Sequence, residues 1–483
     1  MSVLSFVPAH LIPLMVSLLS VYAFTRILPP EEYGLYAIAM SVILLSQSTF
    51  FFWLELGTKR FYEGAQRAGI LPTLAVTVYL GFLLAAAIQV AVGGSALLLV
   101  PLRPELRAVL WTALVVALLR QLSVVGKSFA LASLSRRRFT SMECSESLIG
   151  LAAGIVFCRV FGMGPIGILA GLGVGAVAII AFDSPAFVQR LRGGRVDGHL
   201  QRQLLWFAIP LTLSFFVEAI STQSDRVLIS AFLNDQAVGI YSVSASLAER
   251  AISAPFLALG LAAYPLLVRM HEREGKEGAR RQALSNVTLL LALAIPACGG
   301  FIVASGHLSG VLIGAAYAKE ASEIMPFLAV AMFLFCIRAH YFAHSMHLAQ
   351  RTLLCLIPSI PAALLNVLLN IVLLPHLGVV AAVWAKCIAY AVALAIAIAQ
   401  TRIFFPLPFP TREAAKIVGA TAVMCGLLAA VPFPPGTLGL AGMILSGAIV
   451  YGVLALLLNI AGSRDQGLRL LGRLRSRLPA SAG

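Results

Sequence analysis

Long apolar runs separated by short polar or basic segments recur along the whole chain. Each run approaches the roughly 20 residues that a helix needs to cross the hydrocarbon core of a bilayer. We therefore predict about fourteen transmembrane helices. Their expected ranges are 3–28, 35–56, 70–92, 109–134, 143–159, 165–188, 204–233, 238–267, 283–305, 323–348, 353–374, 379–401, 413–431 and 438–460.

The composition agrees with an all-α polytopic membrane protein. Of the 483 residues, 60% are hydrophobic and 11% are charged, and the mean hydropathy is +0.94. A soluble domain has about 25% charged residues, so an ordinary soluble fold is excluded. The seven cysteines are scattered and form no Cys-x-x-Cys pair. We therefore expect no metal and no cofactor.

The net charge of +15 is explained by the loops. Lysine and arginine gather on one side of the predicted membrane topology, for example at Arg136, Arg190 and Arg269. Loops rich in these residues stay in the cytoplasm, so we predict that this side and both termini are cytoplasmic. The charge therefore reflects topology, and no nucleic-acid partner is expected.

A weak internal repeat divides the chain. Tyr33-Gly34-Leu35-Tyr36 at the start of the second predicted helix resembles Val238-Gly239-Ile240-Tyr241 at the start of the eighth. The two copies are six helices apart and so share an orientation, which predicts a parallel repeat with a substrate path between its halves. The expected parts are an N-terminal six-helix lobe (1–188), a cytoplasmic linker (189–203), a C-terminal six-helix lobe (204–402), two additional transmembrane helices (411–460) and a basic cytoplasmic tail (461–483).

Three acidic residues, Glu218, Asp225 and Glu249, fall inside the helices of the hairpin 209–254. Ser214, Glu218, Ser221 and Asp225 lie on one face of the first helix. A charge at the bilayer centre costs at least about 2.5–3.5 kcal/mol, so such residues usually face a bundle interior or a watery cavity. We interpret the hairpin as a cavity wall, whose carboxylates could exchange a proton or a sodium ion.

Basic residues are also embedded, and they suggest a cavity that attracts an anion, because arginine binds phosphate groups in a bidentate fashion. Two of them, Arg26 and Arg60, lie at helix ends, where extension of the side chain to the membrane surface is an alternative role. The others could instead pair with acids as structural links between helices. The candidates are Arg26, Arg60, Arg120, Lys127, Arg226, Arg250, Arg338 and Lys386.

Two further polar groups have structural interpretations. His340, His344 and His347 lie near one face of a predicted helix, where polar packing is favoured over a metal site or a proton relay. Asn366 and Asn370 are four residues apart, a spacing that suits hydrogen bonds to a neighbouring helix.

Three segments together carry a resemblance to a known family. Residues 26–36, residues 56–60 and residues 224–242 resemble the polysaccharide transporters. These are the Wzx-type oligosaccharide flippases of the multidrug/oligosaccharidyl-lipid/polysaccharide exporter (MOP) superfamily. The resemblance implies two pseudo-symmetric six-helix lobes in a V-shaped, MATE-like bundle, with two C-terminal helices added.

The resemblance also implies a function and a location. Such a protein is a transporter in the bacterial inner membrane and not an enzyme. It would move an undecaprenyl-pyrophosphate-linked oligosaccharide from the cytoplasmic to the periplasmic leaflet by alternating access. The product would serve polysaccharide, O-antigen or exopolysaccharide synthesis, beside a polysaccharide polymerase and glycosyltransferases as partners.

Two alternatives remain open. A cation-coupled multidrug exporter of the same superfamily would share the fold, but its cationic substrates favour a cavity dominated by acids. A membrane-embedded glycan polymerase or ligase should carry a large extramembrane loop with catalytic carboxylates or histidines, and the predicted loops are short.

Overall fold

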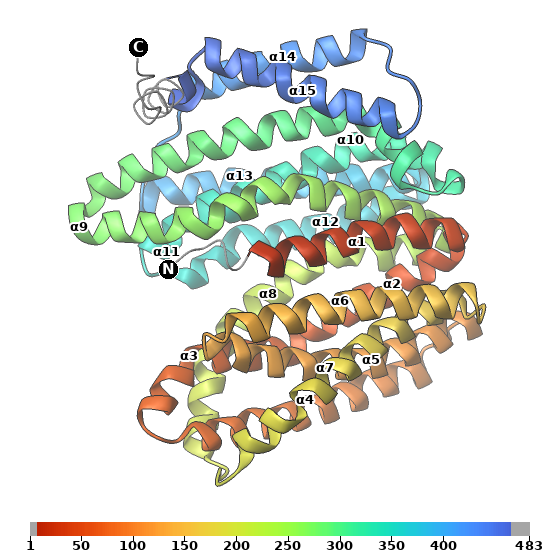
Figure 1. Ribbon diagram of the computed structural model, residues 1–483, viewed down its shortest axis with the longest axis vertical. Helices are drawn as coiled ribbons and strands as arrows, with labels where there is room; N and C mark the ends of the chain where they lie inside the picture. The colour runs from red at the N-terminus through yellow and green to blue at the C-terminus, as the bar shows by residue number, and fades with distance from the viewer. Residues whose placement is uncertain (1–6, 465–483) are drawn as a thin grey trace, which may run out of the picture. The chain divides into compact units, whose positions relative to one another are not determined.

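The computed structural model describes residues 7–464, and nearly all of this range is helical (Figure 1). The start of the predicted first helix and all of the predicted basic tail beyond residue 464 lie outside the described residues. The helices of the first part are α1 (Val7–Ile27), α2 (Pro30–Ser46), the π-helical turn η2 (Gln47–Phe51), α3 (Phe52–Arg67), α4 (Leu71–Leu99), α5 (Pro104–Ala132), α6 (Arg136–Arg159), α7 (Gly164–Leu191) and α8 (Gly198–Phe232).

The second part continues with a long helical run, α9. Its helices are α9 (Asp235–Leu312), α10 (Ala315–Ile337), the π-helical turn η3 (Arg338–Phe342), α11 (Ala343–Leu348), η4 (Thr352–Cys355), α12 (Leu356–Leu377), α13 (Val379–Phe404), α14 (Thr411–Ala430), α15 (Thr437–Leu457) and η5 (Ile460–Gly462).

Proline and aspartate mark where several helices begin. Helices α2, α4, α5 and α7 each have a proline in the first or second position, where the missing N–H would have no helical partner. Helix α8 is capped by Asp197, whose carboxylate accepts hydrogen bonds from the backbone N–H groups of His199 and Leu200 at 2.9 and 3.1 Å.

Within the described residues, twelve helices are long and apolar enough to cross a membrane, so the predicted number of fourteen is not confirmed. The run Asp235–Leu312 counts once, although Gly275 has a left-handed φ of 65° and breaks it. Asn286 Nδ2 donates to the carbonyl oxygen of Ala263 at 3.0 Å, so the two arms of α9 lie antiparallel about this turn (Figure 1). Helix α1 contributes only the shorter apolar segment Leu11–Ile27.

The predicted loops 57–69 and 269–281 are wrong, because most of each is helical. In the first, Lys59 pairs with Glu55, and Arg67 pairs with Glu63, both one turn apart. Such pairs stabilise an exposed helix, so polarity alone was a poor sign of a loop. Of the predicted linker 189–203, only residues 192–197 lie outside helices.

The described chain forms two compact units. Unit 1 extends to Val243 and includes 359–385, and unit 2 comprises 244–358 and the residues from Lys386 onward. Helices α9, α12 and α13 each contribute residues to both units. The predicted lobes 1–188 and 204–402 stay a prediction.

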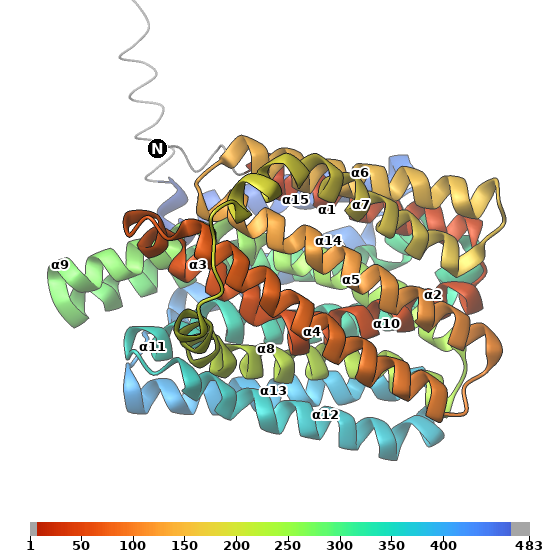
Figure 2. The same cartoon turned by 90° about the horizontal axis from the view of Figure 1, so that it is seen from below.

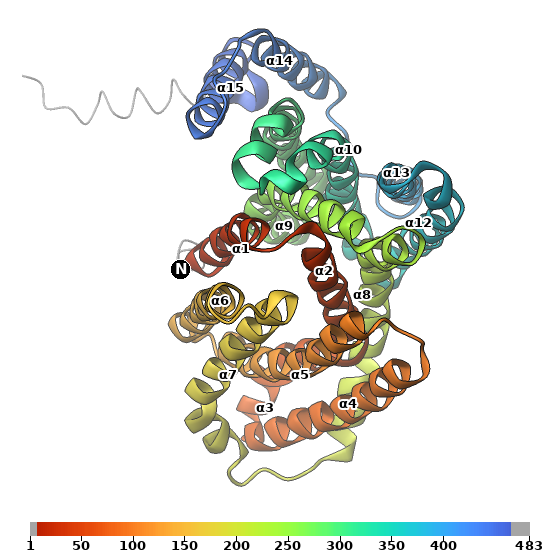
Figure 3. The same cartoon turned by 90° about the vertical axis from the view of Figure 1, so that its right-hand side faces the viewer.

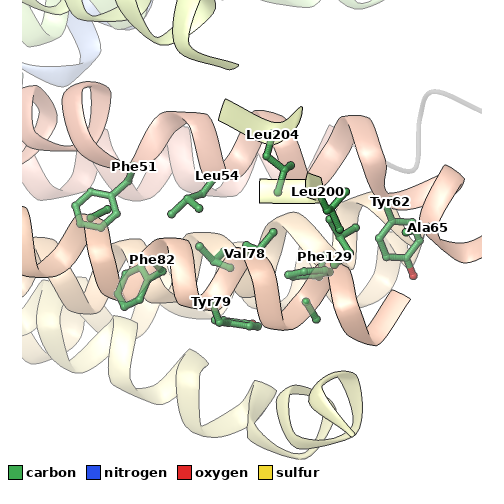
Figure 4. Close-up of a cluster of buried hydrophobic side chains, with 14 residues drawn as sticks. Phe51, Leu54, Tyr62, Ala65, Val78, Tyr79, Phe82, Phe129, Leu200 and Leu204 are labelled. Carbon is green, nitrogen blue, oxygen red and sulfur yellow. The ribbon is translucent and has the colours of Figure 1, made fainter. Parts of the chain in front are cut away.

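In unit 1, helix α7 packs against α5 and α6 (Figures 2 and 3). A Cβ atom on Gly171 would lie 2.4 Å from the backbone nitrogen of Gly154, so α6 and α7 approach closely through small residues. A second contact is the buried cluster of Phe51, Leu54 and Phe82 with Leu204 of α8, which joins η2, α3, α4 and α8 (Figure 4).

In unit 2, α14 and α15 lie side by side (Figure 1). Leu440 and Met443 of α15 pack with Ala304 of α9. The proline-rich segment after α13 is fixed by side chains of η3 and α11. The hydroxyl of Tyr341 donates to the carbonyl oxygen of Pro408, and that of Ser345 donates to the carbonyl oxygen of Phe405 at 2.8 Å.

Candidate functional site

The predicted polar stripe of α8 faces a matching stripe on α12 in unit 1. Ser359 Oγ donates to Glu218 Oε2 at 3.0 Å. About two turns further along both helices, Asn366 Nδ2 donates to Asp225 Oδ1 at 2.7 Å, and Asn370, one turn beyond Asn366, donates its Nδ2 to the same oxygen at 3.2 Å. The expected interhelical role of the two asparagines is therefore confirmed.

Asp225 is completely buried. Besides the two asparagine amides, the hydroxyl of Tyr241 donates to Asp225 Oδ2 at 2.5 Å. These three hydrogen bonds occupy both oxygens of the carboxyl group. Within unit 1, Asp225 thus lies inside helix packing and does not form the surface of an open cavity wall. Glu218, half-buried, is the more accessible carboxylate of the stripe.

The adjacent Arg226 is also buried, but it points to different partners. Its Nη1 donates to Gln223 Oε1 at 2.8 Å and to the carbonyl oxygen of Thr222 at 3.2 Å, and its Nε donates to Ser242 Oγ at 3.2 Å. All three acceptors are neutral. These hydrogen bonds use Nε and Nη1, and none of them ends on a carboxylate.

Lys127 of α5 pairs with two acids of α6. Its Nζ lies 2.8 Å from Glu143 Oε2 and 3.0 Å from Glu146 Oε2, and Ser123 Oγ donates to that Glu146 oxygen at 2.6 Å. The sequence allowed pairing of Lys127 with acids as a structural link but did not identify Glu143 and Glu146 as its partners. The available signal was the spacing of three between the two glutamates, which places them on one helix face.

A second ionic cluster lies beside α5 and was not predicted. Asp183 of α7 is 5% exposed and receives Arg138 Nη2 at 2.6 Å. Arg190 holds the same carboxylate with both terminal nitrogens, at 2.9 and 2.8 Å. A Cβ atom on Gly126 would lie 2.9 Å from Asp183 Oδ2, so glycine lets α5 approach the cluster. The two arginines had been assigned to a loop and to the linker.

Arg120 differs from these basic residues. It lies in the middle of α5 and is half-buried. Among residues 7–464, its guanidinium makes no hydrogen bond, ion pair or ring contact, whereas Lys127, seven residues later, is paired twice. A charge in a membrane-spanning segment without a counter-charge is costly, which makes Arg120 the strongest candidate for an external anion.

Arg26 is exposed at the end of α1, whereas Arg60, predicted at a helix end, is exposed in the middle of α3. Arg26 Nη1 donates to the carbonyl oxygen of Tyr22 at 3.0 Å, and its guanidinium lies 3.7 Å from the centre of the Tyr22 ring. The guanidinium of Arg60 lies 5.9 Å from the centre of the Phe207 ring. Stacking of this kind orients the guanidinium of an arginine.

The remaining predicted residues lie in unit 2. Glu249 is exposed, Arg250 is half-buried, and Arg338 and Lys386 are buried. The guanidinium of Arg338 lies 5.3 Å from the centre of the Phe335 ring.

The histidines of unit 2 pack with aromatic rings. The ring of Tyr264 lies 5.0 Å from that of His344 and 5.7 Å from that of His347, and His340 lies 5.8 Å from Phe256. In the described part of the chain, no group of three histidine, cysteine or acidic side chains could hold a metal ion. Aromatic packing accounts for these side chains.

An ion pair between the exposed Arg103 and the buried Asp235 fixes the start of α9 in unit 1. Arg103 Nη2 lies 2.7 Å from Asp235 Oδ2, and Ser230 Oγ donates to Asp235 Oδ1 at 3.1 Å. The hydrogen bond that Arg103 donates to Asp235 raises the pKa of Arg103 above its ordinary value, and the negative charge of Asp235 adds to the effect. This pair joins the beginnings of α5 and α9.

Comparisons with known proteins identify the fold and the family. Residues 23–322 match a family described as polysaccharide biosynthesis protein. None of the curated proteins matches the sequence. The solved structure of the lipid II flippase MurJ in an inward closed conformation is 14% identical, with a TM-score of 0.76, and the match covers 96% of this chain and 100% of that one.

A multidrug resistance MATE transporter of the MOP superfamily has the same fold. Its inward-facing conformation is 14% identical with a TM-score of 0.66, covering 82% of this chain and 98% of that one. An outward-facing MATE conformation is 15% identical with a TM-score of 0.52, covering 83% and 95%. The chain is therefore a multi-pass membrane protein with the fold of MOP-superfamily transporters, and it belongs to the polysaccharide biosynthesis protein family.

Proposed function

We propose that this chain is a flippase for a lipid-linked oligosaccharide. It moves an undecaprenyl-pyrophosphate-linked glycan from the cytoplasmic to the periplasmic leaflet of the bacterial inner membrane, with both termini in the cytoplasm. Membership of a polysaccharide biosynthesis family and the fold of a lipid II flippase support this proposal. The expected partners are a polysaccharide polymerase and glycosyltransferases.

The observation that carries the proposal is the half-buried guanidinium of Arg120, which has no partner among residues 7–464. A pyrophosphate group supplies two or more negative charges and accepts bidentate hydrogen bonds from arginine. Binding would therefore compensate a charge that the protein leaves uncompensated. Arg226, whose hydrogen bonds end on neutral groups, adds positive charge to the same unit.

The other basic candidates take different roles in this proposal. Arg26 and Arg60 are exposed and contact anions near the membrane surface. In unit 2, the basic residues proposed to attract the anionic substrate are Arg250, Arg338 and Lys386. Lys127, held by Glu143 and Glu146, has a structural role instead.

Transport proceeds by alternating access in this proposal. A membrane potential that is negative inside favours outward movement of negative charge by about 2.3 kcal/mol per charge per 100 mV. The pyrophosphate head group would gain this energy when it is flipped outward. Glu218, Asp225 and Glu249 are the carboxylates that could couple the movement to a proton or a sodium ion.

The test is flipping of a fluorescent undecaprenyl-pyrophosphate oligosaccharide in proteoliposomes that contain the full chain. Protein-free vesicles are the control, and export of a cationic dye under a proton gradient is measured in parallel, because the MATE fold is shared. Flipping of the lipid without dye export is expected. Dye export without lipid flipping would replace this proposal with that of a multidrug exporter.

A further inference from the structure

The beginnings of α2 and α9 cross in unit 1, and the contact between them is reciprocal. A Cβ atom on Gly34 would lie 3.1 Å from the backbone nitrogen of Gly239, and one on Gly239 would lie 3.3 Å from that of Gly34. Gly34 also faces the carbonyl oxygen of Asp235, and Gly239 faces that of Pro30. Gly34 and Gly239 are 205 residues apart, and so are Pro30 and Asp235. The same contact is therefore made twice, between equivalent positions of the internal repeat.

A contact that is made twice between equivalent positions lies on the axis that relates them. In a parallel repeat this axis runs along the membrane normal, and the substrate path lies between the two copies. The crossing is tightly packed, because Tyr33, Val238 and Tyr241 are all buried. It therefore closes the path at the face where α2 and α9 begin.

One ion pair adds to this crossing without being part of the repeat. Arg103, which directly precedes α5, donates from Nη2 to both carboxylate oxygens of Asp235, at 2.8 and 2.7 Å. In the first copy, Pro30 stands at the position equivalent to Asp235, and its side chain can accept no hydrogen bond, so the pair has no counterpart there. The pair joins the predicted lobes 1–188 and 204–402.

The carboxylate of Asp235 is not needed to begin α9. That role belongs to Asn234, whose Oδ1 accepts a hydrogen bond from the backbone N–H of Ala237 at 2.8 Å. The side chain of Asp235 is 8% exposed, whereas that of Arg103 is 56% exposed. An ion pair that is open to water on one side is broken at little cost. Arg103 can therefore leave while the buried Asp235 keeps its hydrogen bond from Ser230.

We infer that the ion pair between Arg103 and Asp235 is a gate contact, which holds the crossing of α2 and α9 closed and breaks when the path opens at this face. The charge distribution makes this face periplasmic. The inference rests on the proposed transport by alternating access, and it assigns the residues that keep the outward exit closed.

Hydrogen–deuterium exchange of the full chain tests the gate contact without a substrate. Several backbone N–H groups at a helix start have no helical acceptor, so their exchange depends on whether water reaches them. Deuterium uptake is followed in residues 30–41 and 235–245 for Arg103→Gln, Asp235→Asn and the double variant. Arg107→Gln is the matched control, because Arg107 lies one turn further along α5 and, among residues 7–464, donates only to a backbone carbonyl oxygen.

We expect each single variant to raise the rate of uptake about threefold in both segments, and the double variant to match the single ones, because all three lose the same interaction. Arg107→Gln should leave both segments unchanged. A rise confined to residues 235–245 would overturn the inference, since it would show only a weakened start of α9.

Unchanged uptake, additive effects in the double variant, or an equal rise in Arg107→Gln would overturn it as well. The outcome is separate from that of the flipping assay. If the variants expose both segments but the wild type flips no lipid-linked glycan, the gate contact stands and the flippase does not. If the wild type flips the glycan and the variants leave uptake unchanged, the flippase stands and the gate contact is wrong.

Discussion

Gly34 of α2 and Gly239 of α9 lie against each other's helix starts in a reciprocal contact. A Cβ atom on Gly34 would lie 1.9 Å from the carbonyl oxygen of Asp235, and one on Gly239 would lie 2.1 Å from the carbonyl oxygen of Pro30. These are equivalent positions of the internal repeat detected in the sequence. The repeat therefore marks a close crossing of two helix beginnings, which only a residue without a side chain permits.

Replacing either glycine should destabilise the protein. In Gly34→Ala and Gly239→Ala, the new methyl group would overlap a backbone carbonyl that cannot rotate away. We expect a loss of about 1–3 kcal/mol, seen as a lower unfolding temperature in detergent.

Gly64→Ala is the matched control for that experiment. Gly64 lies in α3, and no neighbouring atom lies within 4 Å of the place that an alanine methyl group would take there. Alanine should therefore be neutral or stabilising by about 0.5–1 kcal/mol. Equal destabilisation by all three substitutions would show that the crossing is not sterically tight.

Lys127 should be required for stability through its two acids. Lys127→Met leaves Glu143 and Glu146 close together without their cation, which should cost about 3–5 kcal/mol. The triple variant Lys127→Met/Glu143→Gln/Glu146→Gln removes all three charges and should recover most of the loss. Thermal unfolding measures both. A triple variant as unstable as the single one would contradict an ion-pair role.

The sequence predicted the helices well and their polar ends poorly. Apolar length alone located the membrane-spanning runs, because the hydrocarbon core demands it. The segments around Lys59 and Arg273 were taken for loops because they are charged, yet they continue as helices. Charge marks where a helix leaves the lipid but not where it ends.

The candidate site was only partly predictable for a related reason. The stripe at Glu218 and Asp225 was visible from helical spacing, and Asn366 and Asn370 from theirs. Their pairing joins segments far apart in the sequence, so no local pattern could assign it. Asp183 was missed because its partners, Arg138 and Arg190, belong to positions that polarity had assigned to loops.

Coupling through the α8 carboxylates predicts a specific transport phenotype. Glu218→Gln should make flipping insensitive to the ion gradient that drives wild type, while the response to membrane potential remains. Asp225→Asn should also lose about 1–3 kcal/mol of stability, because an amide cannot accept from all the donors that face Asp225. If wild-type flipping ignores both the pH gradient and the membrane potential, coupling through these carboxylates is wrong.

The most direct test of the account compares Arg120→Ala with Arg159→Ala in the flipping assay, at matched amounts of folded protein. Arg120 is half-buried within α5, whereas Arg159 is exposed at the end of α6. If Arg120 receives the pyrophosphate, Arg120→Ala should slow flipping of the lipid-linked oligosaccharide at least about tenfold, and Arg159→Ala should leave it unchanged. Wild-type flipping rates in a folded Arg120→Ala protein would contradict the assignment of this arginine to the substrate.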